Sequence, residues 1–171
     1  MVKTFVLLTA FLFITRTGCS QELAWSEIIS DIRSQYPTVQ QISTDSLANW
    51  LASDTESLPF LIDIREKKEY KVSHLPGAIQ MSPNARKFKS LRDMDKDTPI
   101  VVYCSVGYRS SKMAEKLTAA GFTNVSNLEG SIFTWANEGH TVVRDDEPVT
   151  AVHPYNKVWG MLLKKELRSF D

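Results

Sequence analysis

The sequence predicts an α/β fold in which a parallel sheet of about five strands carries helices on both faces. Strand-like segments, at residues 60–64, 100–103 and 125–128, alternate with segments of helical periodicity. Prolines, glycines and capping residues separate these segments. Strands that alternate with helices favour parallel pairing through right-handed crossovers. Functional sites of such sheets form beyond the carboxyl ends of the strands.

Residues 1–19 are typical of an export signal. Lys3 precedes an apolar core at residues 5–14, and small residues follow near Cys19. The core is shorter than the roughly 20 apolar residues that span a bilayer. The end of the segment resembles a bacterial lipoprotein signal, although Arg16 stands where that signal has an aliphatic residue. We expect export to the periplasm, with Cys19 either removed or lipidated as a membrane anchor.

Residues 20–38 form a predicted helical extension. Apolar residues recur there at helical spacing until Tyr36-Pro37 ends the run; they are Leu23, Trp25, Ile28, Ile29 and Ile32.

The main domain is predicted over residues 39–143. Strands are expected at 39–42, 60–64, 78–81, 100–103 and 125–128. Helices are expected at 45–52, 66–72, 84–91, 111–120 and 132–137. Ser43 or Thr44 would cap the first helix, and Gly121 would end the fourth.

Residues 144–171 are predicted to hold a polar linker, at 144–148, and an amphipathic helix at 156–170. The apolar side of this helix would carry Trp159, Leu162, Leu163, Leu167 and Phe170. We expect the helix to pack on its own domain; docking on a partner or a membrane surface is the alternative.

The loop that follows the strand at 100–103 has the features of an anion cradle. Cys104 ends the strand, and a helix is expected shortly after. Unpaired backbone amides and the positive end of the helix dipole meet at such a point, and both favour a thiolate. Gly107 allows consecutive amides to converge, and Arg109 adds a permanent charge.

Cysteine usage and net charge exclude several classes of function. If Cys19 is removed or lipidated, Cys104 has no partner within the chain, which argues against a dithiol oxidoreductase. The formal net charge is zero, so nothing indicates binding of nucleic acid through a broad basic surface. His140 and His153 are isolated in the sequence, and no ligand cluster predicts a metal site.

Three ordered blocks of this sequence resemble the rhodanese-like sulfurtransferases. The first spans residues 61–66, 69–70 and 74–78, the second residues 104–110, and the third residues 128–131 with Trp135 and 138–140. Ser73 and Ser131 stand where the family has Gly. The resemblance implies a rhodanese fold, no cofactor, and transfer of sulfane sulfur through a persulfide on Cys104. A donor such as thiosulfate and a thiol, cyanide-like or protein acceptor are implied with it.

The remaining candidate residues lie in or beside the loop. Its anion-binding members would be Ser105, Val106, Gly107, Tyr108, Arg109 and Ser110. Arg109 either holds an anionic donor or braces loop carbonyls. Asp63 and Arg65 follow a neighbouring parallel strand and could border the same crevice. We expect instead that Asp63 caps loop amides and that Arg65 pairs with an acid such as Glu69.

Two other classes of function remain open. One is a binding or sulfur-carrier module on the same fold. The other is phosphatase or arsenate chemistry, which is disfavoured because four residues separate Cys104 from Arg109, whereas tyrosine phosphatases have five.

Overall fold

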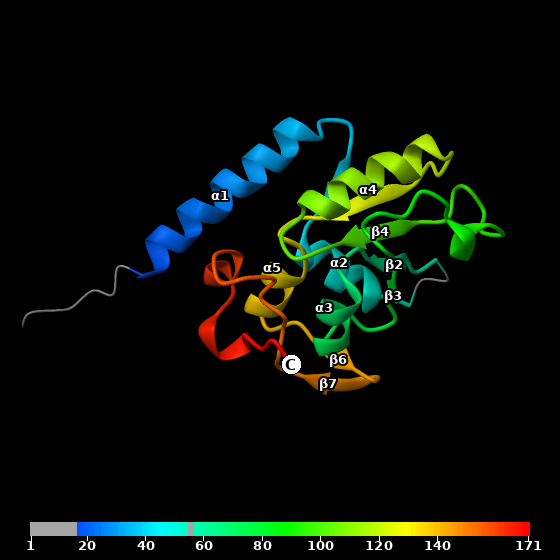
Figure 1. Cartoon of the computed structure of the whole chain (residues 1–171). Coiled ribbons are helices and arrows are strands. Elements are labelled where there is room, and N and C mark those ends of the chain that lie inside the picture. The colour runs from blue at the N-terminus through cyan, green and yellow to red at the C-terminus, as the bar shows by residue number, and fades with distance from the viewer. Residues whose placement is uncertain (1–16, 55–56) are drawn as a thin grey trace, which may run out of the picture.

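The computed structural model describes residues 17–54 and 57–171 (Figure 1). Most of the expected export signal therefore lies outside the described residues; positions 17–19 of it open helix α1 (Thr17–Gln35). Among the described residues, no helix is both long and apolar enough to cross a membrane.

A parallel sheet of five strands organises the chain, as the sequence predicted. The strand order is β1-β5-β4-β2-β3, and every neighbouring pair is parallel. The strands are β1 (Gln40–Ile42), β2 (Phe60–Asp63), β3 (Ile79–Gln80), β4 (Ile100–Tyr103) and β5 (Val125–Leu128). The central strand β4 is buried along its whole length, so its carboxyl end is a fixed point on which a site can be built.

Helices cover both faces of the sheet (Figure 1). They are α2 (Thr44–Leu51), α3 (Lys67–Val72), α4 (Tyr108–Ala119) and α5 (Ser131–Asn137). On one face, Met113 and Leu117 of α4 pack in a cluster with Val102. On the other, Leu47 of α2 and Phe133 of α5 pack in a cluster that includes the neighbouring residues of β4. Side chains alternate between the faces of a strand, which is why β4 contributes to both clusters.

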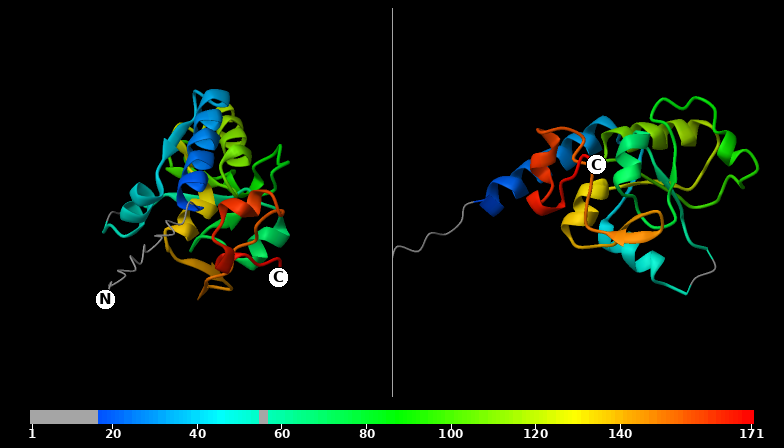
Figure 2. Two further views of the ribbon diagram at one scale, coloured as in Figure 1. Left: turned by 90° about the vertical axis from the view of Figure 1, so that its left-hand side faces the viewer. Right: turned by 60° about the horizontal axis from the view of Figure 1, so that its bottom comes forward.

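The N-terminal extension belongs to the folded unit. Ile32 of α1 is buried, and Trp25 and Ile28 pack against the cluster on the α5 face. The helix ends at Gln35, immediately before Tyr36-Pro37, as its pattern predicted. Helix α1 lies against the C-terminal segment, and two views show these two parts of the chain side by side (Figures 1 and 2).

The helix expected at 84–91 is wrong: the structure has only a 3-10 turn, η1 (Lys89–Leu91), within this range. The reason is local. The backbone N–H groups of Asn84 and Ala85 donate to the side chain and the carbonyl of Ser82, which closes a turn and competes with helical pairing.

The polar linker expected at 144–148 is also wrong, because the chain forms a β-hairpin there. Strands β6 (Val142–Arg144) and β7 (Glu147–Val149) pair antiparallel. The turn consists of Asp145 and Asp146, with φ of 50° and 66°. Two consecutive positive φ values define the turn type that suits tight hairpins, and Asp tolerates them better than most residues. The expected domain boundary at 143/144 therefore cuts a strand.

The C-terminal amphipathic helix is wrong as well. Two short 3-10 helices, η2 (Trp159–Leu162) and η3 (Lys165–Leu167), replace it. The side chain of Asn137 accounts for the break: it donates to Leu162 O at 2.8 Å and accepts from Lys164 N at 2.8 Å. These bonds satisfy backbone groups that a continuous helix would pair internally. The segment packs on its own domain, as expected, with Leu163 fully buried.

Candidate active site

Cys104 lies at the floor of a hollow at the carboxyl end of β4. It follows the last strand residue directly and is 1% exposed. The hollow has a volume of about 140 Å³, and its other lining residues are Ser105, Val106, Tyr108, Arg109, Tyr155 and Trp159. A buried thiol that opens into a small cavity can react only with what enters that cavity.

The loop directs two donors at the sulfur. The backbone N–H of Gly107 donates to Cys104 Sγ at 3.2 Å, and Ser110 Oγ lies 3.4 Å from the same atom. Gly107 has φ of 126°, which side chains resist. A Cβ at this position would stand 2.9 Å from Ile32 Cδ1 of α1. The positive φ is therefore the main reason that this position requires glycine, and a Cβ would in addition displace the end of the Ile32 side chain.

The pKa of the Cys104 thiol is lowered from its ordinary value. Burial raises this pKa, but the positive charge of Arg109 and hydrogen bonds from Ser110 and Gly107 outweigh the burial. The site therefore favours the thiolate, which is the nucleophilic form of cysteine.

Arg109 is held by a carboxylate from another element. Its Nη1 and Nη2 donate to the two oxygens of Glu69 at 2.8 Å each, and Nη2 also donates to Ser105 Oγ at 2.9 Å. The Glu69 side chain is fully buried in α3. Two roles were expected for Arg109: holding an anionic donor or bracing loop carbonyls. The observed contacts are of the bracing kind, but the groups that Arg109 holds are the side chains of Glu69 and Ser105.

Asp63 and Arg65 pair with each other behind the loop, and neither lines the hollow. Asp63 Oδ1 accepts from the backbone N–H of Arg65 at 2.9 Å, and Oδ2 accepts from the guanidinium at 2.7 Å. Both side chains are fully buried, and the guanidinium also donates to Ser73 O. The expected ion pair of Arg65 with an acid is present, but the acid is Asp63 and not Glu69, because the fold directs Glu69 at Arg109.

Ser131, one of the two positions that depart from the family pattern, has a direct contact with the loop. Its Oγ accepts from the backbone N–H of Cys104 at 3.1 Å, and its φ of 52° is one that glycine adopts freely. The serine keeps the glycine-like backbone and adds a hydrogen bond at the cysteine. In the sequence this position was recognised only as a departure from the family's Gly.

Three residues beyond the loop were missed as parts of the site: Glu69, Tyr155 and Trp159. The ring of Tyr155 lies 4.9 Å from the Arg109 guanidinium carbon, and Trp159 meets Tyr108 edge-on at 6.0 Å between ring centroids. Trp159 was predicted only as a core contact of a helix. No pattern around Tyr155 or Glu69 indicates a role at the cysteine, because their positions follow from tertiary packing.

Tyr108 connects the rim of the hollow to α1. Its hydroxyl donates to the carboxylate of Asp31. Partial burial and this carboxylate together raise the pKa of Tyr108 to about 12. The side chain is therefore a neutral donor at physiological pH, fixed at the edge of the cavity.

The description of His140 as isolated is wrong in three dimensions. Its ring nitrogen lies near carboxylates of Asp45 and Glu138, and one ligand atom from each residue falls within 4.8 Å of the others. Asp45 is 87% exposed, so the group resembles a solvated surface cluster.

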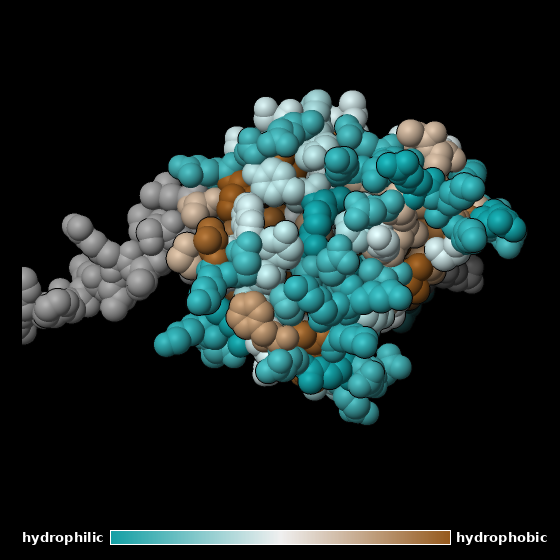
Figure 3. All heavy atoms as spheres, viewed as in Figure 1, coloured by the Kyte–Doolittle hydropathy of each residue, from teal (hydrophilic) through white to brown (hydrophobic). Residues whose placement is uncertain are grey.

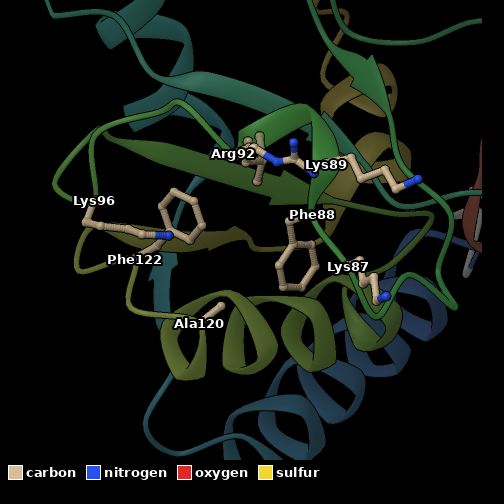
Figure 4. A pocket seen from close by; sticks show the side chains of 8 residues that line it. Lys87, Phe88, Lys89, Arg92, Lys96, Ala120 and Phe122 are labelled. Atoms are coloured by element: carbon tan, nitrogen blue, oxygen red, sulfur yellow. The ribbon is translucent and has the colours of Figure 1, made fainter.

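A wider hollow of about 410 Å³ lies at the opposite, amino-terminal edge of the sheet (Figure 4). Its lining residues are Lys87, Phe88, Lys89, Leu91, Arg92, Lys96, Ala120 and Phe122. The ammonium of Lys96 lies 3.8 Å from the centre of the Phe122 ring. None of these lining residues is a thiol or hydroxyl nucleophile, so we place the candidate chemistry at Cys104.

Comparison with known proteins identifies the family. The model of the rhodanese-like domain matches residues 43–138, more than half of the chain. The chain therefore belongs to the rhodanese-like domain family. Several of its relatives are named as sulfurtransferases, which supports a sulfurtransferase-type enzyme at the level of the family.

Three relatives illustrate the range of proteins that share this domain. A sulfurtransferase of Allochromatium vinosum is 34% identical over 105 residues, which are 61% of this chain and 95% of that protein. A probable adenylyltransferase/sulfurtransferase of Mycobacterium tuberculosis is 29% identical over 65% of this chain and 28% of its own length. A tRNA uridine(34) hydroxylase of Staphylococcus saprophyticus is 31% identical over 71% of this chain and 39% of its own length. The domain thus occurs alone and as part of longer enzymes.

Solved structures agree on the fold. A rhodanese-like domain protein from Staphylococcus aureus superposes with a TM-score of 0.54 at 26% identity, covering 63% of this chain and 99% of that one. A protein from Bacillus halodurans superposes with a TM-score of 0.61 at 22% identity, covering 82% and 98%, and shows the fold alone.

Proposed function

We propose that this protein transfers sulfane sulfur from a donor such as thiosulfate to a thiophilic acceptor through a persulfide on Cys104. The observation that carries the proposal is the position of the sulfur: buried, at the floor of a small hollow, with the Gly107 amide 3.2 Å away and its pKa lowered. These features support a nucleophile that acts as a thiolate, whereas a structural cysteine needs none of them.

The reaction has two balanced steps. In the first, the Cys104 thiolate attacks the outer sulfur of the donor; an S–S bond forms at Sγ, the donor's own bond to that sulfur breaks, and the leaving group departs with the electron pair. With thiosulfate, the leaving group is sulfite. In the second step, an acceptor thiolate or cyanide attacks the terminal sulfur of the persulfide, and Cys104 leaves as a thiolate.

The loop would act on charge in both steps. The Gly107 amide and the Ser110 hydroxyl stabilise negative charge on Sγ before attack and after release, in the manner of an oxyanion hole. Arg109 contributes a charge that Glu69 and Ser105 hold in one orientation, so little reorganisation is needed when the thiolate reacts.

Intact mass spectrometry tests this proposal directly. Incubation with thiosulfate or an inorganic polysulfide should add the mass of one sulfur atom, and an acceptor thiol should remove it. Cys104→Ser should abolish the adduct, whereas Cys19→Ser, which removes the other cysteine of the sequence, should retain it. An unmodified protein after exposure to both donors, or an adduct that survives in Cys104→Ser, contradicts the proposal.

We also propose that the chain works outside the cytoplasm, on the basis of its signal-like residues 1–19. Cell fractionation should place it with the periplasm or the membrane. Mass spectrometry of the membrane-bound form would show a lipid on Cys19 if the segment acts as a lipoprotein signal. Recovery of an uncleaved, unlipidated chain from the cytosol contradicts export.

A further inference from the structure

The C-terminal segment supplies two of the seven residues that line the cysteine hollow. Tyr155 and Trp159 line it together with Tyr108 of the loop. Tyr155 and Trp159 both lie beyond residues 43–138, the part that matches the family model. This wall is therefore an addition of the present chain to the shared domain.

The backbone that carries Trp159 is held in place. Asn156 Oδ1 accepts from the backbone N–H groups of Val158 and Trp159 at 3.0 and 2.9 Å, which fixes the start of η2. A Cβ at Gly160 would stand 2.8 Å from Pro154 Cβ, so the chain is closely packed at this turn. A segment that is already ordered loses little conformational freedom when a ligand binds, so its side chains can contribute to selecting that ligand.

The backbone of Tyr155 carries a further sign of constraint. Its φ is 63°, a value that bulky residues avoid. The N–H of Tyr155 donates to His153 Nδ1 at 3.0 Å, which helps to hold this conformation. Such backbone geometry persists only where the surroundings impose it, and it is frequent around binding sites. Here it places the ring over Arg109 at the mouth of the hollow.

The charges around the hollow do not favour a dianion. Arg109 is the one cation among the seven lining residues, and both of its terminal nitrogens donate to Glu69. With Cys104 ionised, the thiolate and Glu69 contribute two negative charges against one positive charge. A donor with two negative charges is repelled by this balance, whereas an apolar group gains from contact with the aromatic wall.

The size of the hollow suits a small ring. Its volume of about 140 Å³ is close to that of a cavity of about 150 Å³ that binds benzene in another protein. In the space-filling view, apolar residues and pale aromatic ones lie over the C-terminal segment (Figure 3). The exposed large hydrophobic residues of that segment are Tyr155, Val158, Met161 and Phe170.

We infer that Tyr155 and Trp159 select a sulfur donor whose carrier group is apolar or aromatic and which bears at most one negative charge. Organic thiosulfonates and organic persulfides belong to this class; thiosulfate, a dianion, is expected to react at the same cysteine more slowly. The inference rests on the proposed sulfur transfer at Cys104 and names the substrate class of that same site.

Two thiosulfonates provide a matched pair of probes. With benzenethiosulfonate and methanethiosulfonate alike, the thiolate takes the outer sulfur, the S–S bond breaks, and a sulfinate leaves with the electron pair. The rate constant for persulfide formation on the full chain is measured for both, and for thiosulfate. Each rate is divided by that of the same donor with free glutathione, which removes the intrinsic reactivity of the donor.

We expect wild-type protein to prefer the aromatic donor over the methyl donor by about tenfold after this correction. Trp159→Ala should reduce that preference at least fivefold, and Trp159→Phe should restore it. Met161→Ala is the matched control, because Met161 lies on the same 3-10 helix, is 63% exposed and does not line the hollow. It should leave every rate unchanged.

The outcomes separate this inference from the proposed function. Persulfide formation from all three donors with no aromatic preference, or a preference that survives Trp159→Ala, overturns the substrate class but leaves the sulfur transfer standing. Thiosulfate as the fastest corrected donor also overturns it. Failure of every donor to form a persulfide on Cys104 overturns both.

Discussion

Replacing Ser110 by alanine tests how the site stabilises the Cys104 thiolate. Ser110 Oγ lies 3.4 Å from Cys104 Sγ and 3.1 Å from Gly107 O, and its single proton can serve one acceptor at a time. If the proton is directed at the thiolate, the alanine variant loses a hydrogen bond to a charged group. If it is directed at Gly107 O, the thiolate loses nothing.

The expected shift follows from the strength of such a bond. Hydrogen bonds to charged groups contribute about 1.5–3 kcal/mol, and the O–S distance places this one near the lower limit. Since one pKa unit corresponds to about 1.4 kcal/mol, Ser110→Ala should raise the pKa of Cys104 by about one unit. Below both pKa values the thiolate fraction falls about tenfold, and the greater nucleophilicity of the more basic thiolate offsets about threefold of this loss.

The assay is the pH titration of the thiolate by its ultraviolet absorbance, with alkylation rates as a second readout. Both are measured in a Cys19→Ser background, in which Cys104 is the remaining cysteine of the sequence. Ser111→Ala is the matched control: Ser111 is the next residue of α4, equally buried, and its hydroxyl has no hydrogen-bond partner within the described part of the chain. Equal pKa values in Ser110→Ala and wild type would refute the direct bond to sulfur.

Three further variants test the framework of the site. Glu69→Gln should cost about 2–3 kcal/mol, measured by urea denaturation, because Arg109 loses its counter-ion and is only one quarter exposed. Burial raises the pKa of Glu69, but Arg109 outweighs it and leaves the pKa below 4.5. The stabilisation from Glu69 is therefore complete above pH 4.5 and is lost as the pH falls through the lowered pKa. Glu69→Gln should remove this dependence of the unfolding free energy on acid pH. The same pH dependence in the variant and the wild type would contradict the pairing. Asp63→Ala should cost about 3–5 kcal/mol by leaving Arg65 buried without a counter-ion, and a loss below 1 kcal/mol would refute this. Gly107→Ala should slow persulfide formation more than tenfold, with alkylation as a parallel measure, and wild-type rates would show that the positive φ is dispensable.

The sheet and the position of the cysteine could be predicted because both depend on local signals. The observed bounds of β4 and β5 equal the predicted ones. The segment of β4 is a continuous apolar run, as expected of a buried parallel strand, whereas β5, which contains Ser126 and Asn127, was expected after the helix that Gly121 ends. The position of Cys104 at the end of β4 could also be predicted. The same holds for the unusual backbone conformation of Gly107, three residues further on. Strand order and register then bring Asp63 beside Tyr103 and so near the same edge.

The ion pairs could not be predicted, because two acids and two arginines compete. Asp63 and Glu69 are both within reach of Arg65 by sequence distance, and nothing in the sequence ranks them. The fold decides: helix α3 directs Glu69 at Arg109, forty positions further along the chain. The apolar spacing from Trp159 to Phe170 misled for a related reason. The same apolar spacing is compatible with one helix and with two 3-10 helices. The structure has the second arrangement, in which the side chain of Asn137 bonds to the backbone between them.

The shared domain and the two segments outside it, helix α1 and the C-terminal segment, contribute different things to the site for a physical reason. Holding charge on sulfur needs fixed backbone donors, and a strand, a glycine loop and a helix start provide these within residues 103–111. Selecting a donor needs only side chains around the opening, which any adjoining segment can provide. Helix α1 reaches the loop through Asp31, and the C-terminal segment reaches the opening through Trp159. Both segments lie outside residues 43–138. The proposed sulfur chemistry of Cys104 therefore rests on the shared domain, and the proposed selection of its donor rests on segments outside it.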